Sequence, residues 1–521
     1  MTAYAVCAAA GLALAAAFPS PGLWPLAWLA LVPLLVSVRG KPLALAFRLG
    51  WTFGLSFYLA ALYWVAPTVS NYTRIPVAVS LLLLLLLAVV VALGPGLFAL
   101  GLEWMAAARI SRVLVAPILW VVIEWSRTFF PVGFPWVSLG YSQHSVLTVL
   151  QTADLAGVYG ISALLVFVNT ALAELRDGAE RHRRLVAAVV VLLVAVVTYG
   201  HLRLLAVEGA RAVASIRVGL VQANVEQAGK WDDRLQDDIL GRHMALSRQA
   251  VERGAELIVW PEASLPFVFN SDPRSRELLD FAATRGVHML VGAPGYGPRN
   301  GKAAMAYNEA LHISAAGTVA EPYEKIQLVP FGEYVPFGPL LGWVDRAVEV
   351  VGTFGRGSRR VVFEGPRAEF STGPRPARFS ALICYEAIFP SLVRSFVTAG
   401  ADLLVNISND AWYGRSSAPH QHLAMSAMRA IEHRMPLVRA TNTGISAFVA
   451  PSGRVISATG LFETAVVVET VMIPETGSVY STVGDLFVYL CLAALVLLAY
   501  TRHRLGIVLI DGRGRGILGG P

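Results

Sequence analysis

The sequence is dominated by apolar runs, most of them long enough to cross a lipid bilayer. A membrane-spanning helix needs ~20 mostly apolar residues, with a range of about 17 to 25. Runs of this kind, the first two of them short, lie at residues 3–18, 22–38, 43–66, 76–104, 113–130, 152–173, 185–205 and 483–500. Hydrophobic residues make up 55% of the chain and charged residues 15%, a balance too apolar for a soluble enzyme. The pattern therefore predicts a multi-pass α-helical membrane domain with eight spanning helices.

A long polar stretch separates the seventh apolar run from the eighth. We therefore expect a membrane domain with seven helices over residues 1–211 and a domain outside the bilayer over 212–478. The eighth spanning helix is expected over 479–503, and a flexible cytoplasmic tail over 504–521.

Basic residues predict the orientation of the chain. They gather in alternate connections, at Arg39, Lys41, Arg109, Arg112, Arg176, Arg181, Arg183, Arg184, Arg502 and Arg504, whereas the intervening loops are almost free of them except for Arg74. Cytoplasmic loops carry an excess of Lys and Arg, so both termini are expected in the cytoplasm and the polar domain outside. Membrane orientation also accounts for the formal net charge of +7 without a nucleic-acid partner.

Apolar strand-like segments alternate with helix-like segments in the polar stretch. The expected strands are 215–225, 255–260, 401–408, 436–442 and segments that begin at His288, Ala310 and Phe379, and the expected helices end near Arg253 and cover about 420–434. Alternating strand and helix units with apolar strands predict a layered α/β domain.

Cys384 is the candidate nucleophile because an apolar strand, FSALI, delivers it to a predicted strand-to-helix turn. At such a turn the N–H group of Tyr385 can face an oxyanion. The other two cysteines, Cys7 and Cys491, lie in apolar runs, so no disulfide framework is expected. A buried core cysteine is the alternative interpretation of Cys384, since free cysteines are often buried.

Two further segments carry candidate catalytic groups. WPEAS places Glu262 directly after an apolar strand, and YEKIQLVPFGEYVP places Lys325 at a strand exit with Glu333 eight residues later. A carboxylate base, a cation and a thiol form the minimum set for acyl transfer through a thioester. Taken singly, Glu262 could be a surface acid and Lys325 a solvated charge. In the membrane part, Glu124 and Arg127 stand three residues apart, which predicts a structural ion pair rather than a site for lipid head groups.

These motifs carry a family resemblance. WPE, YEK with LVPFGEYVP, and ICYE follow one another with Glu262, Lys325 and Cys384 separated by 63 and 59 residues. This order is similar to the Glu-Lys-Cys triad of the nitrilase, or carbon–nitrogen hydrolase, superfamily. NISNDAWYG, RAIEHR and TNTGIS extend the match, and with the flanking apolar runs and the GFPW and GYSQ segments nearly the whole chain resembles the apolipoprotein N-acyltransferase family.

The resemblance implies an αββα nitrilase-like domain on the periplasmic side of the bacterial inner membrane. It implies that phosphatidylethanolamine donates its sn-1 acyl chain to Cys384, and that the thioester then acylates the α-amino group of the diacylglyceryl-modified N-terminal cysteine of an apolipoprotein. Glu262 is then the acid and base, and Lys325 with the Tyr385 N–H stabilises the oxyanion. No metal or organic cofactor and no nucleic acid is implied, and we expect a monomer.

The resemblance also points to supporting residues. Trp231 resembles a family tryptophan near the substrate entrance, and Glu333, Tyr385 and Glu386 match positions that the family treats as essential. Trp231 could instead be an interfacial anchor, and Glu333 an acid that orients Lys325. Residues 336–357 predict a lid that dips into the membrane with Leu340, Leu341 and Trp343. These three residues could instead cap the domain core. Two rival functions stay open at this stage, a membrane-tethered amidase or nitrilase for small amides and a non-catalytic scaffold that presents lipoproteins.

Overall fold

The computed structural model describes residues 2–72, 75–129, 132–175, 179–298, 304–336, 354–475 and 477–504. Internal contacts divide the chain into two compact units. The helical unit comprises residues 1–67, 76–203 and 483–521, and the sheet unit comprises residues 68–75 and 204–482. Arg74 and residues 505–521 of the expected tail lie outside the described residues.

The helical unit holds the apolar runs. Its elements are α1 (Ala3–Ala15), η1 (Trp24–Trp28), α2 (Val32–Val38), α3 (Leu43–Ala61), α5 (Val77–Val91), α6 (Leu93–Ala106), α7 (Arg112–Ser126), η2 (Leu139–Gln143), α8 (Leu147–Leu150), α9 (Ala153–Ala173), α10 (Ala179–Glu208) and α18 (Leu486–Arg504). The short α4 (Val65–Tyr72) and the last residues of α10 cross the boundary between the units.

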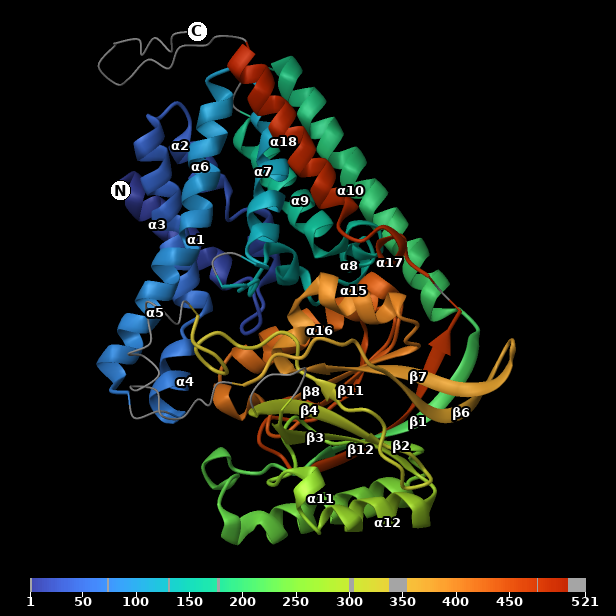
Figure 1. The fold of residues 1–521 in the computed structure, drawn as a ribbon. Helices are drawn as coiled ribbons and strands as arrows, with labels where there is room; N and C mark the ends of the chain where they lie inside the picture. The colour runs from blue at the N-terminus through green and yellow to red at the C-terminus, as the bar shows by residue number, and fades with distance from the viewer. Residues whose placement is uncertain are drawn as a thin grey trace. The chain divides into compact units, whose positions relative to one another are not determined.

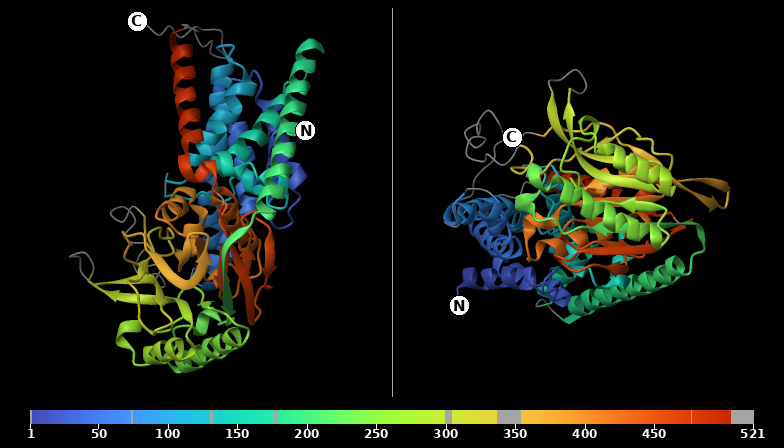
Figure 2. Two further views of the ribbon diagram at one scale, coloured as in Figure 1. Left: turned by 90° about the vertical axis from the view of Figure 1, so that its right-hand side faces the viewer. Right: turned by 90° about the horizontal axis from the view of Figure 1, so that it is seen from below.

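Five helical stretches among the described residues are long and apolar enough to cross a membrane. They are Leu43–Ala61, Val77–Ala106, Ala153–Ala173, His182–Glu208 and Leu486–His503. Only 6% of the most apolar part of His182–Glu208 is buried against protein, and Figure 2 shows α10 standing apart from α18. Such uncovered apolar helix surface is suited to lipid. A membrane-spanning character is therefore supported, and the count of eight spanning helices stays a prediction.

The run 22–38 differs from the expected single helix. It forms η1 and then, after an interruption, the seven-residue α2, with Pro25 and Pro33 at the beginnings of these two elements. Proline has no backbone N–H and is tolerated in the first turn of a helix but not in its interior. Pro33 therefore begins a new helix instead of continuing the first.

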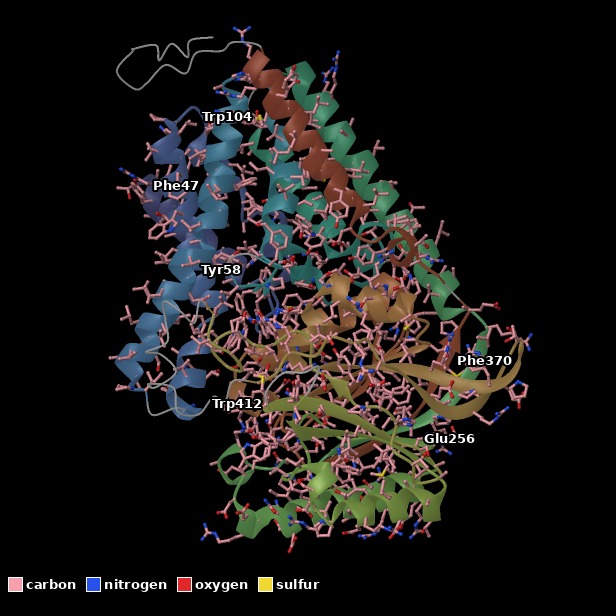
Figure 3. The ribbon with its side chains drawn as sticks, in the orientation of Figure 1. Phe47, Tyr58, Trp104, Glu256, Phe370 and Trp412 are labelled. Atoms are coloured by element: carbon pink, nitrogen blue, oxygen red, sulfur yellow. The ribbon has the colours of Figure 1, made fainter. Side chains whose placement is uncertain are left out.

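The ion pair expected between Glu124 and Arg127 does not form. The Glu124 carboxylate accepts hydrogen bonds from Trp120 Nε1 (2.8 Å) and from the Leu139 backbone N–H. The Arg127 guanidinium donates to the Tyr58 hydroxyl (3.0 Å), and also to the Trp136 carbonyl and the Ser138 hydroxyl; Tyr58 is labelled in Figure 3. The prediction of pairing was wrong because each charge finds partners in the loop that follows α7.

The sheet unit contains two six-stranded sheets. The first has the strand order β12-β1-β2-β3-β4-β5 and the second β11-β10-β9-β8-β7-β6. The bounds are β1 (Ala212–Gln222), β2 (Leu257–Val259), β3 (His288–Gly297), β4 (Met305–Ile313), β5 (Tyr323–Glu324) and β12 (Ala465–Pro474) for the first sheet, and β6 (Val362–Phe370), β7 (Gly373–Ile383), β8 (Leu403–Ser408), β9 (Leu437–Thr441), β10 (Ala447–Val449) and β11 (Val455–Ala458) for the second.

Helices cover the outer faces of both sheets. Figure 1 shows α11 (Gln236–Glu252) and α12 (Ser275–Arg285) against the first sheet, and α15 (Pro390–Thr398) and α16 (Ala418–His433) against the second. The remaining helices are η3 (Gln227–Gly229), η4 (Asp233–Leu235), η5 (Phe269–Ser271), η6 (Cys384–Ile388), η7 (Asp410–Tyr413) and α17 (Val479–Val483).

A buried apolar core joins α11 and α12 to the first sheet and includes Met244, Trp260 and Phe281. The sheets face each other, because His312 on β4 contacts the rings of Phe363 and Phe379 on β6 and β7. The expected layered α/β fold is confirmed. Since β1, β2 and β3 are parallel, as are β7, β8 and β9, the carboxyl ends of the strands in each set meet at one edge.

Candidate active site

Loops at the carboxyl ends of strands carry the candidate catalytic side chains. Glu262 lies three residues beyond the end of β2, Lys325 directly follows β5, and Cys384 directly follows β7. The three residues come from both sheets and are all buried, with 6% or less of each exposed. The fold therefore brings together side chains that the sequence separates by about sixty residues at each step.

A hydrogen-bonded ion cluster surrounds Lys325. Its ammonium contacts Glu262 Oε1 at 3.1 Å and Glu333 Oε1 at 2.8 Å. The side-chain amide of Asn308, on β4, donates to the same two carboxylates at 2.7 and 3.1 Å. The second oxygen of Glu262 accepts the backbone N–H of Asn409 at 2.8 Å. Glu262 is thus held by three donors, and Glu333 is a second carboxylate partner of Lys325.

Charge pairing sets the protonation states of this cluster. Burial alone would raise the pKa of Glu262, but Lys325 holds it below its ordinary value. Burial also disfavours charge on Lys325, yet Glu262 and Glu333 raise its pKa well above the ordinary value. The pKa of the Cys384 thiol is raised, first by burial and then by the negative charge of Glu262. The resting site therefore holds a carboxylate, an ammonium and a protonated thiol.

Cys384 occupies a strained turn. Its φ is 53°, in the left-handed region, which costs a non-glycine residue ~1–2 kcal/mol. Cys384 is the first residue of η6 and directly follows the last residue of β7. Its backbone carbonyl is held by the side chains of His422 and Asn406. A strained backbone conformation persists only where surrounding contacts hold it in place, and the hydrogen bonds from His422 and Asn406 are such contacts.

Glu386 clamps this turn to the strand exit that carries Lys325. The Glu386 carboxylate is fully buried, and burial raises its pKa to about 7. It accepts hydrogen bonds of 2.7 to 3.1 Å from the backbone N–H groups of Ile383, Ile326 and Gln327 and from the Tyr323 hydroxyl. Because one carboxylate binds both segments, it fixes the spacing between the nucleophile and the cation.

Two predicted supporting residues lie at different depths. The Tyr385 ring is buried and packs edge-on against Phe389. Trp231 is 51% exposed, whereas its neighbour Lys230 is buried and donates to the backbone carbonyl of Glu262 at 3.3 Å. The Lys230 side chain therefore points into the protein, and the ring of Trp231 lies at the surface, where substrate can reach it.

Comparison with known proteins identifies the family. Residues 10–171 match the family described as the apolipoprotein N-acyltransferase N-terminal domain, and residues 217–480 match the carbon-nitrogen hydrolase family. An apolipoprotein N-acyltransferase from Geobacter metallireducens is 39% identical over 509 residues, covering 96% of this chain and 95% of that protein. The chain belongs to the apolipoprotein N-acyltransferase family. A second member, from Chlorobaculum tepidum, is 31% identical and covers 94% of each chain.

The solved structure of an amidase from Nesterenkonia sp. is also similar, with 20% sequence identity and a TM-score of 0.37. It covers 54% of this chain and 97% of that one. Family membership confirms the resemblance drawn from the ordered motifs. It also favours an acyltransferase over a small-amide hydrolase, because the match extends over the helical unit as well as the sheet unit.

Several residues of this candidate site were not predicted from the sequence. Asn308 is a polar residue inside a buried strand, and Lys230 was overlooked beside the more conspicuous Trp231. The Asn409 amide belongs to the NISND motif, which marked the segment but not its contact with Glu262. The predicted lid residues Leu340, Leu341 and Trp343 lie outside the described residues. No group of three or more His, Cys, Asp or Glu side chains in the described part of the chain is placed to hold a metal ion.

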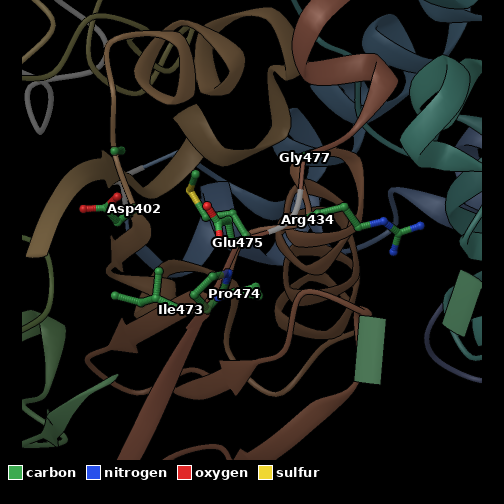
Figure 4. A pocket seen from close by; sticks show the side chains of 9 residues that line it. Asp402, Arg434, Ile473, Pro474, Glu475 and Gly477 are labelled. Carbon is green, nitrogen blue, oxygen red and sulfur yellow. The ribbon is translucent and has the colours of Figure 1, made fainter. Parts of the chain in front are cut away.

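A separate cavity of about 330 Å³ lies at the other end of the strands (Figure 4). It is lined by residues that include Asp402, Pro436 and Glu475. Asp402 directly precedes β8 and Pro436 directly precedes β9, whereas the candidate catalytic residues follow the strands. The cavity is therefore distinct from the Glu262, Lys325 and Cys384 cluster.

Proposed function

We propose that this member of the family transfers an acyl chain from a phospholipid to the α-amino group of a diacylglyceryl-modified apolipoprotein through a thioester on Cys384. The observation that carries the proposal is a buried Glu262–Lys325 ion pair whose two charges act on the thiol of the strained Cys384 turn, in a chain of this family. The donor is phosphatidylethanolamine, used at its sn-1 ester.

The first half-reaction forms the thioester. Glu262 accepts the thiol proton of Cys384 as the sulfur attacks the ester carbonyl, whose oxygen becomes an oxyanion. The Lys325 ammonium and the Tyr385 N–H stabilise that charge. Collapse of the intermediate breaks the carbon–oxygen bond, and the departing alkoxide takes the proton from Glu262. The products are the acyl-enzyme and a lysophospholipid.

The second half-reaction transfers the acyl group. The amine of the apolipoprotein attacks the thioester carbonyl, and Glu262 accepts a proton from the attacking nitrogen. Collapse breaks the carbon–sulfur bond, and the Cys384 thiolate takes that proton back. An amide forms and the thiol is restored. Glu333 acts throughout by holding Lys325, and Glu386 by holding the two segments together.

The apolar helices fit an enzyme embedded in the membrane that contains its donor. The basic loops support a bacterial inner-membrane location with eight spans and the sheet unit on the periplasmic side. Trp231 lines the substrate entrance, and the enzyme acts as a monomer.

The test is mass spectrometry of the purified protein after incubation with acyl-labelled phosphatidylethanolamine and no acceptor. The proposal predicts an acyl adduct on Cys384 that hydroxylamine removes and that Cys384→Ala lacks. Subsequent addition of a diacylglyceryl-modified peptide with a free amine should discharge the adduct, and its N-acetylated counterpart should not. A folded protein in lipid that forms no adduct, but releases ammonia from simple amides, would overturn the proposal.

A further inference from the structure

A buried polar network lies beneath the nucleophile turn. The ring of His422, on α16, is fully buried, and its Nε2 lies 3.1 Å from the carbonyl oxygen of Cys384. A longer contact of 3.4 Å joins the side-chain amide of Asn406 to the same oxygen. The mechanism proposed above uses the side chain of Cys384 and the N–H of Tyr385 but does not use His422.

The contacts of His422 assign its proton. An arginine can only donate, and Arg439 places a guanidinium nitrogen 3.0 Å from His422 Nδ1. Asp410 Oδ1, which can only accept, lies 3.3 Å from the same nitrogen, so the contacts of Nδ1 do not settle its role, and the proton on Nε2 is assigned from the Cys384 carbonyl. Burial lowers the pKa of His422, which favours the neutral form. A carbonyl oxygen can only accept, so Nε2–H donates to the Cys384 carbonyl.

Charged groups pack against the Nδ1 side of the ring. Arg439 also binds Asp410 Oδ2 at 2.7 Å and the side chains of Asn406 and Ser426, and Asp410 Oδ1 lies 3.3 Å from His422 Nδ1. His422, Asp410 and Arg439 are all buried. A buried ion pair is weak evidence for stability because desolvation offsets its attraction. Because Arg439 and Asp410 both contact Nδ1 of His422, this ion pair instead fixes the orientation of the imidazole ring.

The carbonyl of Cys384 and the N–H of Tyr385 belong to one peptide group. In a trans peptide these two bonds point in opposite directions because the group is planar. A hydrogen bond that holds the carbonyl toward the network thus aims the N–H away from the network, and the proposed mechanism requires that N–H to face the oxygen of the substrate carbonyl. This peptide lies at the start of η6, where Cys384 has its strained φ.

We propose that His422, held by Arg439 and Asp410, is a positioning residue that orients the Cys384–Tyr385 peptide as an oxyanion donor. The inference rests on the proposed thioester chemistry of Cys384. His422 touches neither the substrate nor the thiol in this scheme. Its contribution is to carbonyl substrates alone, because only they develop an oxyanion.

Two reagents separate orientation of the peptide from general integrity of the site. A p-nitrophenyl ester acylates Cys384 through an oxyanion, whereas iodoacetamide alkylates it by displacement of iodide without one. Removing one oxyanion donor costs about 10²–10³ in rate. His422→Phe, which keeps a ring but no donor, should slow acylation at least about tenfold and leave alkylation of Cys384, followed by peptide mass spectrometry, within about twofold. His422→Gln, which restores an N–H donor, should recover most of the acylation rate.

Ser426→Ala is the matched control, because the Ser426 hydroxyl contacts the Arg439 guanidinium and the backbone carbonyl of His422, but neither the His422 ring nor the Cys384 carbonyl. It should leave both rates near those of the wild type. Equal losses of acylation and alkylation in His422→Phe, or no loss of either, would overturn the inference. If His422→Phe does not fold, the same two rates are measured for His422→Gln and His422→Leu. Wild-type protein that reacts with the p-nitrophenyl ester but not with phosphatidylethanolamine would refute the proposed donor while leaving this comparison decisive.

Discussion

Replacement of Glu333 by Gln tests whether two carboxylates share the Lys325 ammonium as the mechanism requires. Glu333 Oε1 lies 2.8 Å and Glu262 Oε1 lies 3.1 Å from Lys325 Nζ. At an effective dielectric constant near 20, the gross Coulomb attractions are ~6 and ~5 kcal/mol. The two carboxylates therefore compete almost equally for one cation. Removing the charge of Glu333 leaves the ammonium to Glu262 alone.

We expect Glu333→Gln to make Glu262 a weaker base and to leave the Lys325 ammonium bound to Glu262 instead of shared between two carboxylates. The pKa of Glu262 should fall further, because it keeps Lys325 and loses a neighbouring negative charge. General base catalysis contributes about 10²–10⁴ in rate, so acylation of Cys384 should slow by about 10²-fold or more. The free energy of unfolding should fall by only ~1–3 kcal/mol, since Lys325 retains one buried partner.

The assay is single-turnover acylation of Cys384 followed by intact mass, with thermal unfolding in detergent beside it. Glu333→Asp is the control, because it keeps the charge and should retain more activity than Gln. The reasoning is refuted if Glu333→Gln acylates at the wild-type rate. It is also refuted if the Asp and Gln variants are equally slow while both remain folded, since charge would then not be the deciding property.

Three further changes test other contacts of the site. Lys230→Met removes a buried cation that helps to lower the pKa of Glu262, so the acid limb of the acylation pH profile should move to higher pH. Lys230→Arg keeps the positive charge and should leave the acid limb unchanged. An acid limb that does not move in Lys230→Met would contradict this effect of Lys230 on Glu262. Glu386 has a pKa raised to about 7, chiefly by burial, so its folded form binds a proton more tightly than the unfolded form. Its contribution to stability should be complete below about 4.5 and be lost as the pH rises toward about 7, and this slope of unfolding temperature against pH should be absent from Glu386→Gln. Trp231 is half exposed, so Trp231→Ala should change the free energy of unfolding by no more than ~0.5 kcal/mol. The same variant should slow acylation from phospholipid vesicles but not from a p-nitrophenyl ester, and equal slowing with both donors would argue against a role at the entrance.

The order of local patterns was enough to predict the layered α/β fold, the apolar helices and the family. Periodicity and apolar runs are local properties, and the strands that end at Cys384 and near Glu262 were recognised from a few residues on either side. Family resemblance added Glu333 and Glu386 as supporting residues. Glu333 contacts Lys325, and Glu386 accepts the backbone N–H of Ile383, next to Cys384; their support of catalysis stays a prediction.

Tertiary structure alone decided which polar groups meet. Asn308 sits inside a strand with no local signal of function, yet it donates to Glu262 and Glu333. Glu124 and Arg127 have the spacing of an ion pair, but the loop after α7 offers each of them other partners. His422 is not among the predicted site residues, and its contact with the Cys384 carbonyl spans 38 residues. Sequence spacing records neighbours along a helix or strand, whereas these contacts depend on where separate strands and loops end in space.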